Sequence, residues 1–303
     1  MEPELEKKGL NSRNKHRFGY DYTALCEALP LLKNFTGKTR FGYESIDFAN
    51  PDAVKMLNRA LLKYHYGIDE WDIPANYLCP PIPSRAEYIH QVADVLGVHD
   101  GGETPFEKKI SILDIGMGAN CIYPILGHQE YGWQFVGSDI DPMAIASAEK
   151  IIKNNPSLHG VVECRLQTSA YHIFKNIILP TDFFHCTVCN PPFHASSAKA
   201  KTAAQRKIKN LSTDISGETI LNFGGQNTEL WCRGGEIAFI FKMISESEQY
   251  KSQVLWFSTL VSKIKNVEKI YRRLIKAKVA EIKSIDIEVG NKKSRIIFWT
   301  FTE

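Results

Sequence analysis

The sequence predicts an α/β fold, in which a doubly wound, mostly parallel sheet has an antiparallel edge formed by its C-terminal strands. From residue 109 onward, short apolar and β-branched runs alternate with segments of helical periodicity, which is typical of parallel strands joined by helices. Near the end of the chain, two further β-prone runs are joined through Gly290-Asn291, a sequence that favours a β-hairpin. We therefore expect this hairpin to supply the antiparallel edge.

The composition is that of a soluble globular protein, with 44% hydrophobic residues, 23% charged residues and a net charge of +3. No apolar run reaches membrane-spanning length, and the N-terminal segment lacks the apolar centre of a signal peptide. The seven cysteines show no disulfide spacing, so we expect a reducing, cytoplasmic location. We also expect a monomer without a membrane partner. Because the net charge is modest, any surface for nucleic acid must be formed by local basic clusters.

Three regions are expected along the chain. They are a basic N-terminal arm with a short helix over residues 1–45, a mainly helical extension over 46–100, and a larger α/β domain over 101–303.

The helical extension carries recognisable start signals. Asn50-Pro51-Asp52 predicts a helix start, and the apolar face that follows extends the helix to about Tyr66. Four prolines between Trp71 and Pro83 predict an extended linker. Ser84-Arg85-Ala86-Glu87 has the form of a capping box, so we expect another helix to begin there and to continue to Leu96.

The α/β domain is expected to hold six strands before the hairpin. The strands are expected at residues 109–113, 133–138, 161–166, 183–189, 235–243 and 254–260, the hairpin strands at 282–288 and 295–301, and helices at 143–154 and 266–278.

A glycine turn closes the first of these strands, at Asp114-Ile-Gly116-Met-Gly118. Glycine there lets the backbone approach a ligand closely. The third glycine of a dinucleotide fingerprint is absent, because Cys121 occupies its position, and a pyrophosphate cofactor is therefore disfavoured. Asp139 ends the second strand, where a carboxylate can accept hydrogen bonds from both hydroxyls of a ribose.

The fourth strand ends in Asn190-Pro191-Pro192-Phe193, where two prolines force the chain out of the sheet. Ligands of open α/β sheets bind at this carboxyl edge. Asn190 offers a side-chain acceptor and Phe193 a flat ring, which together suit the binding of a planar NH₂ group. In this order, the glycine turn, Asp139 and the proline turn indicate methyl transfer from S-adenosyl-L-methionine (AdoMet).

These residues fit the chemistry of such a transfer. Transfer from a sulfonium is an in-line displacement, so positioning supplies much of the catalysis. The amine of adenine is a weak nucleophile because its lone pair conjugates with the ring, and acceptors on its hydrogens help to free that pair. We expect the Asn190 Oδ1 and the Pro191 carbonyl to be these acceptors. Phe193 would stack on a base that has left its helix.

Two basic clusters are candidates for contact with RNA phosphates. One lies in the N-terminal arm and the other directly follows the proline turn: Lys7, Lys8, Arg13, Lys15 and Arg17, and then Lys199, Lys201, Arg206 and Lys207. A frayed terminus and a solvated loop are the alternative interpretations. The basic stretch at residues 263–278 also has an apolar face, so we interpret its charges as the solvent-exposed face of a helix that covers the sheet.

No metal site is predicted. Cys186 and Cys189 form a single C-x-x-C inside an expected strand, without a second cysteine pair, and small core residues are the better interpretation. The histidines show no shared ligand spacing. Arg85 is expected in the first turn of its helix, where its charge opposes the helix dipole, so we expect it to meet an anion. Solvation at the surface is the alternative interpretation.

Longer stretches along nearly the whole chain carry a resemblance to a known family. They are Arg13 to Phe18, Pro83 to His90, Asp114 to Tyr123, Cys189 to Phe193, Gly234 to Glu236 and Ser294 to Phe301. In these stretches the chain resembles the ribosomal RNA large subunit methyltransferase F family of adenine-N6 methyltransferases. More distantly, it resembles the eukaryotic methyltransferase-like enzyme that acts on U6 RNA.

The resemblance implies a class I, Rossmann-like methyltransferase that uses AdoMet to methylate one adenosine in 23S ribosomal RNA or a large-subunit precursor. It implies that Arg85 contacts AdoMet, that the turn from Asp114 through Gly116 to Gly118 lies under it, and that Asp139 holds its ribose. Gln167 is placed near the adenine of AdoMet by its position only, and Asn190 is expected to adjoin the cofactor. His194 departs from the wider class, which leaves its role open.

Two other functions remain open from the residues. An Asn-Pro-Pro-aromatic turn also suits a protein glutamine-N5 methyltransferase, whose substrate is another planar NH₂ group. A catalytically inert RNA-binding assembly factor could keep the same fold. The basic clusters favour RNA over a protein substrate, and the intact Asp139, Asn190 and Phe193 favour an enzyme.

Overall fold

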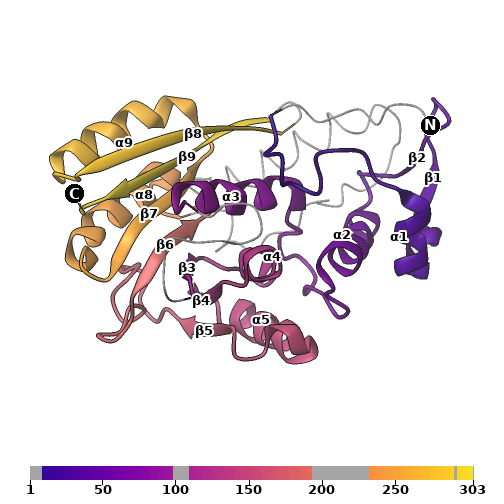
Figure 1. Cartoon of the computed structure of the whole chain (residues 1–303), viewed down its shortest axis with the longest axis horizontal. Coiled ribbons are helices and arrows are strands. Elements are labelled where there is room, and N and C mark those ends of the chain that lie inside the picture. The colour runs from indigo at the N-terminus through magenta and orange to yellow at the C-terminus, as the bar shows by residue number, and fades with distance from the viewer. Residues whose placement is uncertain (1–8, 98–108, 193–231, 290–291, 303) are drawn as a thin grey trace.

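A computed structural model describes residues 9–97, 109–192, 232–289 and 292–302, and a seven-stranded sheet lies at its centre (Figure 1). The strands lie in the order β5-β4-β3-β6-β7-β9-β8. The first five in this order are parallel, and β9 is antiparallel to both β7 and β8. The predicted sheet with an antiparallel C-terminal edge is therefore confirmed. The strands are β3 (Ser111–Ile115), β4 (Gln134–Asp139), β5 (Val162–Leu166), β6 (Phe184–Cys189), β7 (Val254–Val261), β8 (Glu281–Val289) and β9 (Lys292–Thr300).

Helices precede the sheet in the chain and alternate with its strands. They are α1 (Tyr22–Ala28), α2 (Pro51–Tyr66), α3 (Ile82–Val95), α4 (Ile122–Tyr131), α5 (Pro142–Asn154), α8 (Gly235–Ser247) and α9 (Ile264–Lys276), with short 3-10 turns η1 (Pro30–Asn34), η2 (Pro156–Leu158) and η3 (Glu248–Tyr250). A separate hairpin of β1 (Thr36–Lys38) and β2 (Glu44–Ile46) lies beside α1 at the N-terminal end of the molecule (Figure 1). Among the described residues, no helix is long and apolar enough to cross a membrane.

The start of α2 follows from its sequence as predicted. The side chain of Asn50 accepts hydrogen bonds from the backbone N–H groups of Asp52 and Ala53, while Pro51 occupies the first helical turn. These bonds satisfy two of the donors that a helix N-terminus leaves unpaired. Gly67, at a φ of 64°, ends the helix in the left-handed conformation that glycine adopts without strain.

The expected capping box at the start of α3 is wrong. The helix begins two residues earlier, with Pro81 as its N-cap and Pro83 in its first turn. The Ser84 hydroxyl donates to the Pro81 carbonyl at 3.1 Å instead of capping an N–H. Glu87 does not reach back along the helix either, because its carboxylate accepts hydrogen bonds from Asn11 and Asn14.

The strand expected at residues 235–243 is also wrong, because this segment forms α8. Its apolar run resembles a buried strand in the sequence, and short apolar runs do not distinguish strand from helix. In the structure the buried apolar residues Ile240, Met243 and Ile244 recur at helical spacing. Gly234, at a φ of 85°, turns the chain into the helix.

The strands place alternate side chains in two separate hydrophobic layers. Ile112 belongs to the layer that includes α2, α3 and α4, whereas Leu113 belongs to the layer that includes α8 and α9. The same alternation separates Phe298 from Trp299 on β9. This period of two is expected for strands that are buried on both faces. The prediction that α9 covers one face of the sheet is confirmed.

The N-terminal segment is fixed to the body of the protein, so the alternative of a frayed terminus is wrong for residues 9–20. The Asn14 side chain donates to Glu87 and to the Pro83 carbonyl, both at 3.1 Å, and His16 lies fully buried against Tyr66. One hydrophobic layer continues from Tyr22 through α2 and α3 into the sheet. The domain boundaries at residues 45 and 100 stay a prediction. This hydrophobic layer contains residues from both sides of each boundary.

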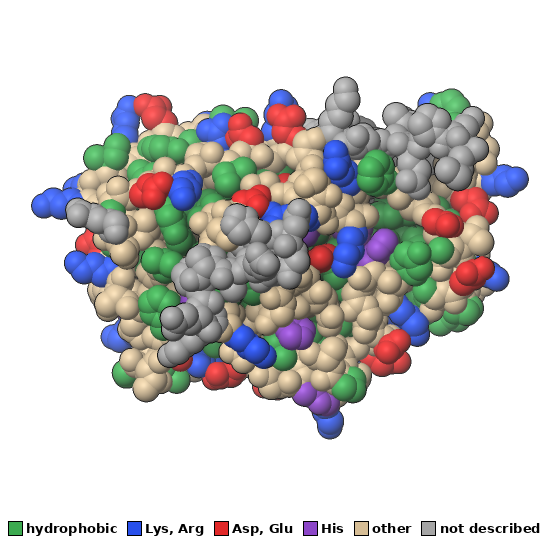
Figure 2. All heavy atoms as spheres, in the orientation of Figure 1, with side chains coloured by type: hydrophobic (Ala, Val, Ile, Leu, Met, Phe, Trp, Pro, Cys, Tyr) green, Lys and Arg blue, Asp and Glu red, His purple; other side chains and the backbone are tan. Residues whose placement is uncertain are grey.

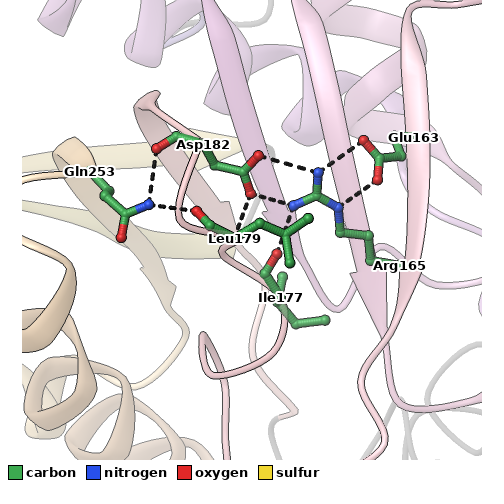
Figure 3. A network of polar contacts seen from close by, with 6 residues as sticks. All are labelled: Glu163, Arg165, Ile177, Leu179, Asp182 and Gln253. Carbon is green, nitrogen blue, oxygen red and sulfur yellow. Dashed lines mark hydrogen bonds and ion pairs between the residues drawn. The ribbon is translucent and has the colours of Figure 1, made fainter.

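A polar network fixes the segment that leads from β5 to β6 (Figure 3). Arg165 on β5 pairs with Glu163 at 2.7 Å and with Asp182, and it donates to the Ile177 carbonyl at 2.7 Å. Gln253, next to β7, donates to the carbonyls of Leu179 and Asp182 at 2.6 and 3.0 Å. The network joins the edge strand to the centre of the sheet and supports β6, whose far end carries the proline turn.

Candidate active site

The glycine turn after β3 is held against the end of β4. The N–H groups of Gly116 and Met117 both donate to the Ser138 carbonyl at 2.9 Å. Gly116 and Gly118 have φ values of 71° and 69°, a conformation that favours glycine. A Cβ atom added at Gly116 would meet no atom within 4 Å, so space is open above this residue.

Asp139 lies at the carboxyl end of β4 and anchors the same turn. Its Oδ2 accepts from the Gly118 N–H and its Oδ1 from the Asp141 N–H, both at 2.9 Å. Burial raises the pKa of Asp139, and the two backbone hydrogen bonds act in the opposite direction. Each carboxylate oxygen keeps a second lone pair, so Asp139 can accept hydrogen bonds from a ligand without releasing the turn.

Asp114 is fully buried, and neither of its carboxylate oxygens has a hydrogen-bond partner among the described residues. Burial raises its pKa well above the usual range, Asp139 raises the pKa further, and Arg85 lowers it. Arg85 is 7% exposed, and its guanidinium carbon lies 5.8 Å from the centre of the Tyr123 ring. The site thus contains an unpaired buried acid and a buried arginine next to the glycine turn.

Asn190 follows β6 directly, and its Oδ1 is buried without a hydrogen-bond partner in the described part of the chain. The register pairs Ile115 with Cys189 and also with Ser138. The residues that follow these three are therefore neighbours at one edge of the sheet, and the glycine turn, Asp139 and Asn190 come together there. Pro191 is buried beside Asn190, whereas Phe193 and His194 lie outside the described residues.

Gln167 lies next to this site, but its side chain has a local role. Its backbone N–H donates to the Asp139 carbonyl at 2.8 Å. Its amide nitrogen donates to the carbonyls of Ile173 and Lys175 at 3.4 and 2.9 Å, and its amide oxygen accepts from the Ser169 N–H at 3.0 Å. These bonds shape the loop after β5, and a contact between Gln167 and the cofactor stays a prediction.

The linker before α3 covers the glycine turn, which sequence reasoning missed. The Trp71 indole N–H donates to the Asn120 carbonyl at 2.9 Å, and the Tyr77 hydroxyl donates to Asp141 at 2.6 Å. The Asn120 side chain donates to the Leu78 carbonyl at 3.4 Å. Prolines predicted an extended segment here, but no local signal indicates which distant residues an extended segment will contact.

Glu236 belongs to the Gly234-Gly235-Glu236 motif of the sequence, and in the structure its role is structural. Its buried carboxylate accepts hydrogen bonds from the Ser262 backbone N–H at 2.6 Å, from the Ser262 hydroxyl, and from the Asn266 side chain at 2.6 Å. These contacts fix the start of α9 on α8. A glutamate beside a glycine pair in the sequence does not reveal such distant partners.

Two of the predicted phosphate contacts are engaged inside the protein. Arg13 pairs with Asp94 and donates to the His90 carbonyl at 3.3 Å, and Lys15 pairs with Glu130 at 3.0 Å. Arg17 lies near the ring of Phe18, at 5.7 Å. Lys7, Lys8, Lys199, Lys201, Arg206 and Lys207 lie outside the described residues.

The C-x-x-C cysteines lie in β6 as buried core residues. Burial raises the pKa of Cys186 to about 12 and that of Cys189 well above its usual range, which keeps both thiols protonated. Among the described residues, no group of three or more His, Cys, Asp or Glu side chains could hold a metal ion.

Comparisons with known proteins agree with this architecture. A family model described as RNA methyltransferase matches residues 4–303. Ribosomal RNA large subunit methyltransferase F of Flavobacterium psychrophilum is 51% identical over 296 residues, which cover 98% of this chain and 94% of the relative. The protein of the same name from Shewanella halifaxensis is 49% identical, over 97% of this chain and 82% of the relative.

Solved structures with the same fold cover nearly the whole chain. The hMettl16 catalytic domain in complex with MAT2A 3'UTR hairpin 1 is 26% identical, with a TM-score of 0.82, over 98% of this chain and 96% of that one. The same domain in complex with hairpin 6 has a TM-score of 0.80 and also 26% identity, over 98% of both chains.

Proposed function

The chain belongs to the RNA methyltransferase family, and we propose that it methylates the exocyclic N6 amine of one adenosine in 23S ribosomal RNA. It is an enzyme of this family, and AdoMet is its methyl donor. The names of its relatives support a large-subunit ribosomal RNA as the substrate. The chemistry of the site fits a planar NH₂ group, and the resemblance to adenine-N6 methyltransferases implies that this group is the N6 amine of one adenosine.

The residues at the carboxyl edge fit AdoMet. The open space above Gly116 leaves room for the cofactor, and Asp139 retains lone pairs for its ribose hydroxyls. Arg85 would bind its carboxylate, and the unpaired oxygens of Asp114 would accept hydrogen bonds from its ammonium group. When bound, AdoMet supplies a methyl group on a positively charged sulfur.

The observation that carries the proposal is the buried Asn190 Oδ1, which has no hydrogen-bond partner among the described residues. An unpaired buried acceptor is costly unless a ligand completes it. An amine N–H of adenine would complete it, and the Pro191 carbonyl would accept the second N–H. The two hydrogen bonds direct the amine lone pair toward the methyl group. The methylated amine is acidic enough to lose its proton to water, so no strong base is required.

The β1–β2 hairpin supplies an RNA-facing surface that the sequence analysis did not single out. Its turn is fixed by the bond from the Thr39 N–H to the Tyr43 carbonyl at 2.8 Å and presents Arg40 and Phe41 at its tip. Phe41 is 71% exposed, and the Arg40 guanidinium lies 4.6 Å from the centre of its ring. Exposed rings beside cations suit stacking on unpaired bases. Elsewhere, the face in Figure 2 shows Lys and Arg interspersed with Asp and Glu.

The experiment is incubation of the protein with methyl-labelled AdoMet and large-subunit RNA from cells that lack this protein, together with ribosomal proteins. We expect the label in the RNA. Label in a protein would instead support the glutamine-N5 methyltransferase. RNA binding without any transfer would support the inert assembly factor.

A further inference from the structure

The hydroxyl of Tyr88 lies where three elements of the site meet. Tyr88 is fully buried on α3, and its ring lies edge-on to Tyr123 on α4, with centroids 5.4 Å apart. The hydroxyl oxygen accepts a hydrogen bond from the backbone N–H of Cys189 at 3.3 Å and lies 2.8 Å from the Ser258 Oγ on β7. Cys189 is the residue directly before Asn190, so this hydroxyl is hydrogen-bonded to the residue from which the proline turn begins.

Between β6 and β7, side chains replace the backbone ladder at this end of the sheet. The paired residues of β6 and β7 are Phe184 with Val254 and Cys186 with Trp256. Beyond them, the Ser258 N–H donates to the Thr187 Oγ1 at 3.0 Å, and the Ser258 hydroxyl donates to the Thr187 carbonyl. On its β7 side the end of β6 is therefore held by hydroxyl groups, while on its other side it stays paired with β3 through Cys189.

The hydroxyl protons have one consistent arrangement. The single proton of Ser258 goes to the Thr187 carbonyl, so the Tyr88 proton goes to the Ser258 Oγ. The Tyr88 oxygen then keeps its lone pairs for the Cys189 N–H. This chain of bonds starts and ends on β6, at Cys189 and Thr187, and spans the residue between them. Burial raises the pKa of Tyr88 well above its usual range, so the proton stays in place at neutral pH.

The same face of α3 carries the arginine proposed to bind the cofactor. Arg85 and Tyr88 are three residues apart on the helix, a spacing that places both side chains on one face. Both lie against the Tyr123 ring. The guanidinium carbon of Arg85 is 5.8 Å from the ring centre, and the centre of the Tyr88 ring is 5.4 Å from it. One rigid helix thus reaches both the methyl-donor side and the acceptor side of the site.

We propose that Tyr88 is a positioning residue for methyl transfer, whose hydroxyl holds the Cys189 amide and thereby sets the direction of the Asn190 side chain. The inference rests on the proposed role of Asn190. Without this hydrogen bond the Cys189 N–H loses the acceptor that it has in the described part of the chain. The β7 side of the proline turn is then released, while the β3 side stays paired. Since misplacement of a reacting group by about 1 Å can reduce a rate roughly a hundredfold, a small rotation is sufficient to impair transfer.

The test is Tyr88→Phe, which keeps the ring and removes only the hydroxyl. We expect the turnover rate at saturating AdoMet and RNA to fall about tenfold or more. The Kd values for AdoMet and for RNA should stay within about twofold, because Arg85, Asp139 and the RNA-facing surface are untouched. Ser258→Ala, which removes the next link of the chain, should lower turnover in the same way. The double variant should be little worse than either single one, because both changes break one chain.

Tyr66→Phe is the matched control. Tyr66 is equally buried, and its hydroxyl makes a 2.8 Å hydrogen bond with His16 in the N-terminal segment, away from the proline turn. We expect it to lower the melting temperature without changing turnover. If its turnover falls as much as that of Tyr88→Phe, the role of Tyr88 is only structural and the proposal is wrong.

A second readout does not depend on activity. Hydrogen exchange at the Cys189 amide should be faster in Tyr88→Phe than in the wild type and unchanged in Tyr66→Phe. Asn190→Ala, measured alongside, separates the two claims. If Asn190→Ala keeps its turnover, the proposed function of the turn fails. If Asn190→Ala is inactive while Tyr88→Phe turns over like the wild type, the inference about Tyr88 fails alone.

Discussion

Individual residues at the carboxyl edge of the sheet have unused hydrogen-bonding capacity. Asp114 and Asn190 each bury oxygen atoms without a partner among the described residues. An unsatisfied buried polar group costs about 1–3 kcal/mol, so a protein that keeps two such residues near one edge of its sheet is organised for a ligand. The proposed ligands are the amino-acid part of AdoMet for Asp114 and the target amine for Asn190.

The sharpest prediction for a single residue concerns Asn190. Asn190→Ala should lower kcat by about a hundredfold or more, because it removes an acceptor that acts on the reacting amine. The Kd for AdoMet should change by less than about threefold, since the cofactor is held mainly by other residues. Single-turnover kinetics and calorimetry measure the two quantities. Activity close to that of the wild type would remove Asn190 from the mechanism.

A second prediction concerns Asp139 and pH. Asp139→Asn should weaken AdoMet binding roughly tenfold to a hundredfold, because hydrogen bonds to a charged acceptor contribute about 1.5–3 kcal/mol. Burial raises the pKa of Asp139, so its carboxylate is protonated at a higher pH than that of an ordinary aspartate. In the wild type, AdoMet affinity should therefore decrease as the pH falls toward this raised pKa.

The loss of affinity on acidification should be smaller in Asp139→Asn, because the titrating group is gone. Calorimetric titration of both proteins across the acidic range measures the difference. An identical pH dependence in the two proteins would show that Asp139 does not hold the cofactor.

The sequence predicted some of these residues better than others. Asp139 and Asn190 stand at strand ends, and strand ends can be read from local patterns of apolar residues. Tyr88 could not be identified in this way, because its partners Cys189 and Ser258 lie far away in the sequence. For Gln167 the sequence correctly predicted a position beside the site. It did not reveal that the Gln167 amide makes hydrogen bonds within the loop after β5.

At the scale of elements, α3 joins three parts of the protein. Its Glu87 receives the N-terminal segment, its Arg85 lies beside the glycine turn, and its Tyr88 reaches the end of β6. The sequence predicted this helix but placed its start two residues late, because Ser84 and Glu87 have the form of a capping box. The apolar run at residues 235–243 predicted a strand where the structure has α8, because a short apolar run shows little periodicity.

The docking of the N-terminal segment on α3 changes the expectation for its basic residues. Arg13 is occupied by Asp94 and the His90 carbonyl, whereas Arg40 is at the tip of the exposed β1–β2 turn. Arg13→Ala should lower stability without altering the salt dependence of RNA binding. Arg40→Ala should reduce the slope of log affinity against log salt by about one unit, if Arg40 contacts one phosphate.

Titrations of RNA binding at several salt concentrations and urea unfolding separate the two variants. An unchanged slope in Arg40→Ala, or a reduced slope in Arg13→Ala, would contradict this assignment.

At the scale of the whole molecule, the register of the sheet assembles the site. Ile115 pairs with both Ser138 and Cys189, so three motifs from distant parts of the chain end at one edge. The alternation of strands and helices predicted a parallel sheet, and the hairpin predicted its antiparallel edge. The order of the strands and the closure of the linker over the glycine turn depend on contacts between distant segments, which local patterns do not encode.

The central claim is that this fold delivers a methyl group to the N6 amine of one adenosine in 23S ribosomal RNA. The most direct measurement is mass spectrometry of nucleosides from 23S RNA, taken from cells that lack the protein and then incubated with the purified protein and AdoMet. We expect N6-methyladenosine at about one per RNA molecule, and none with Asn190→Ala. A methyl group on another atom or another base, or methylation at many adenosines, would contradict the account.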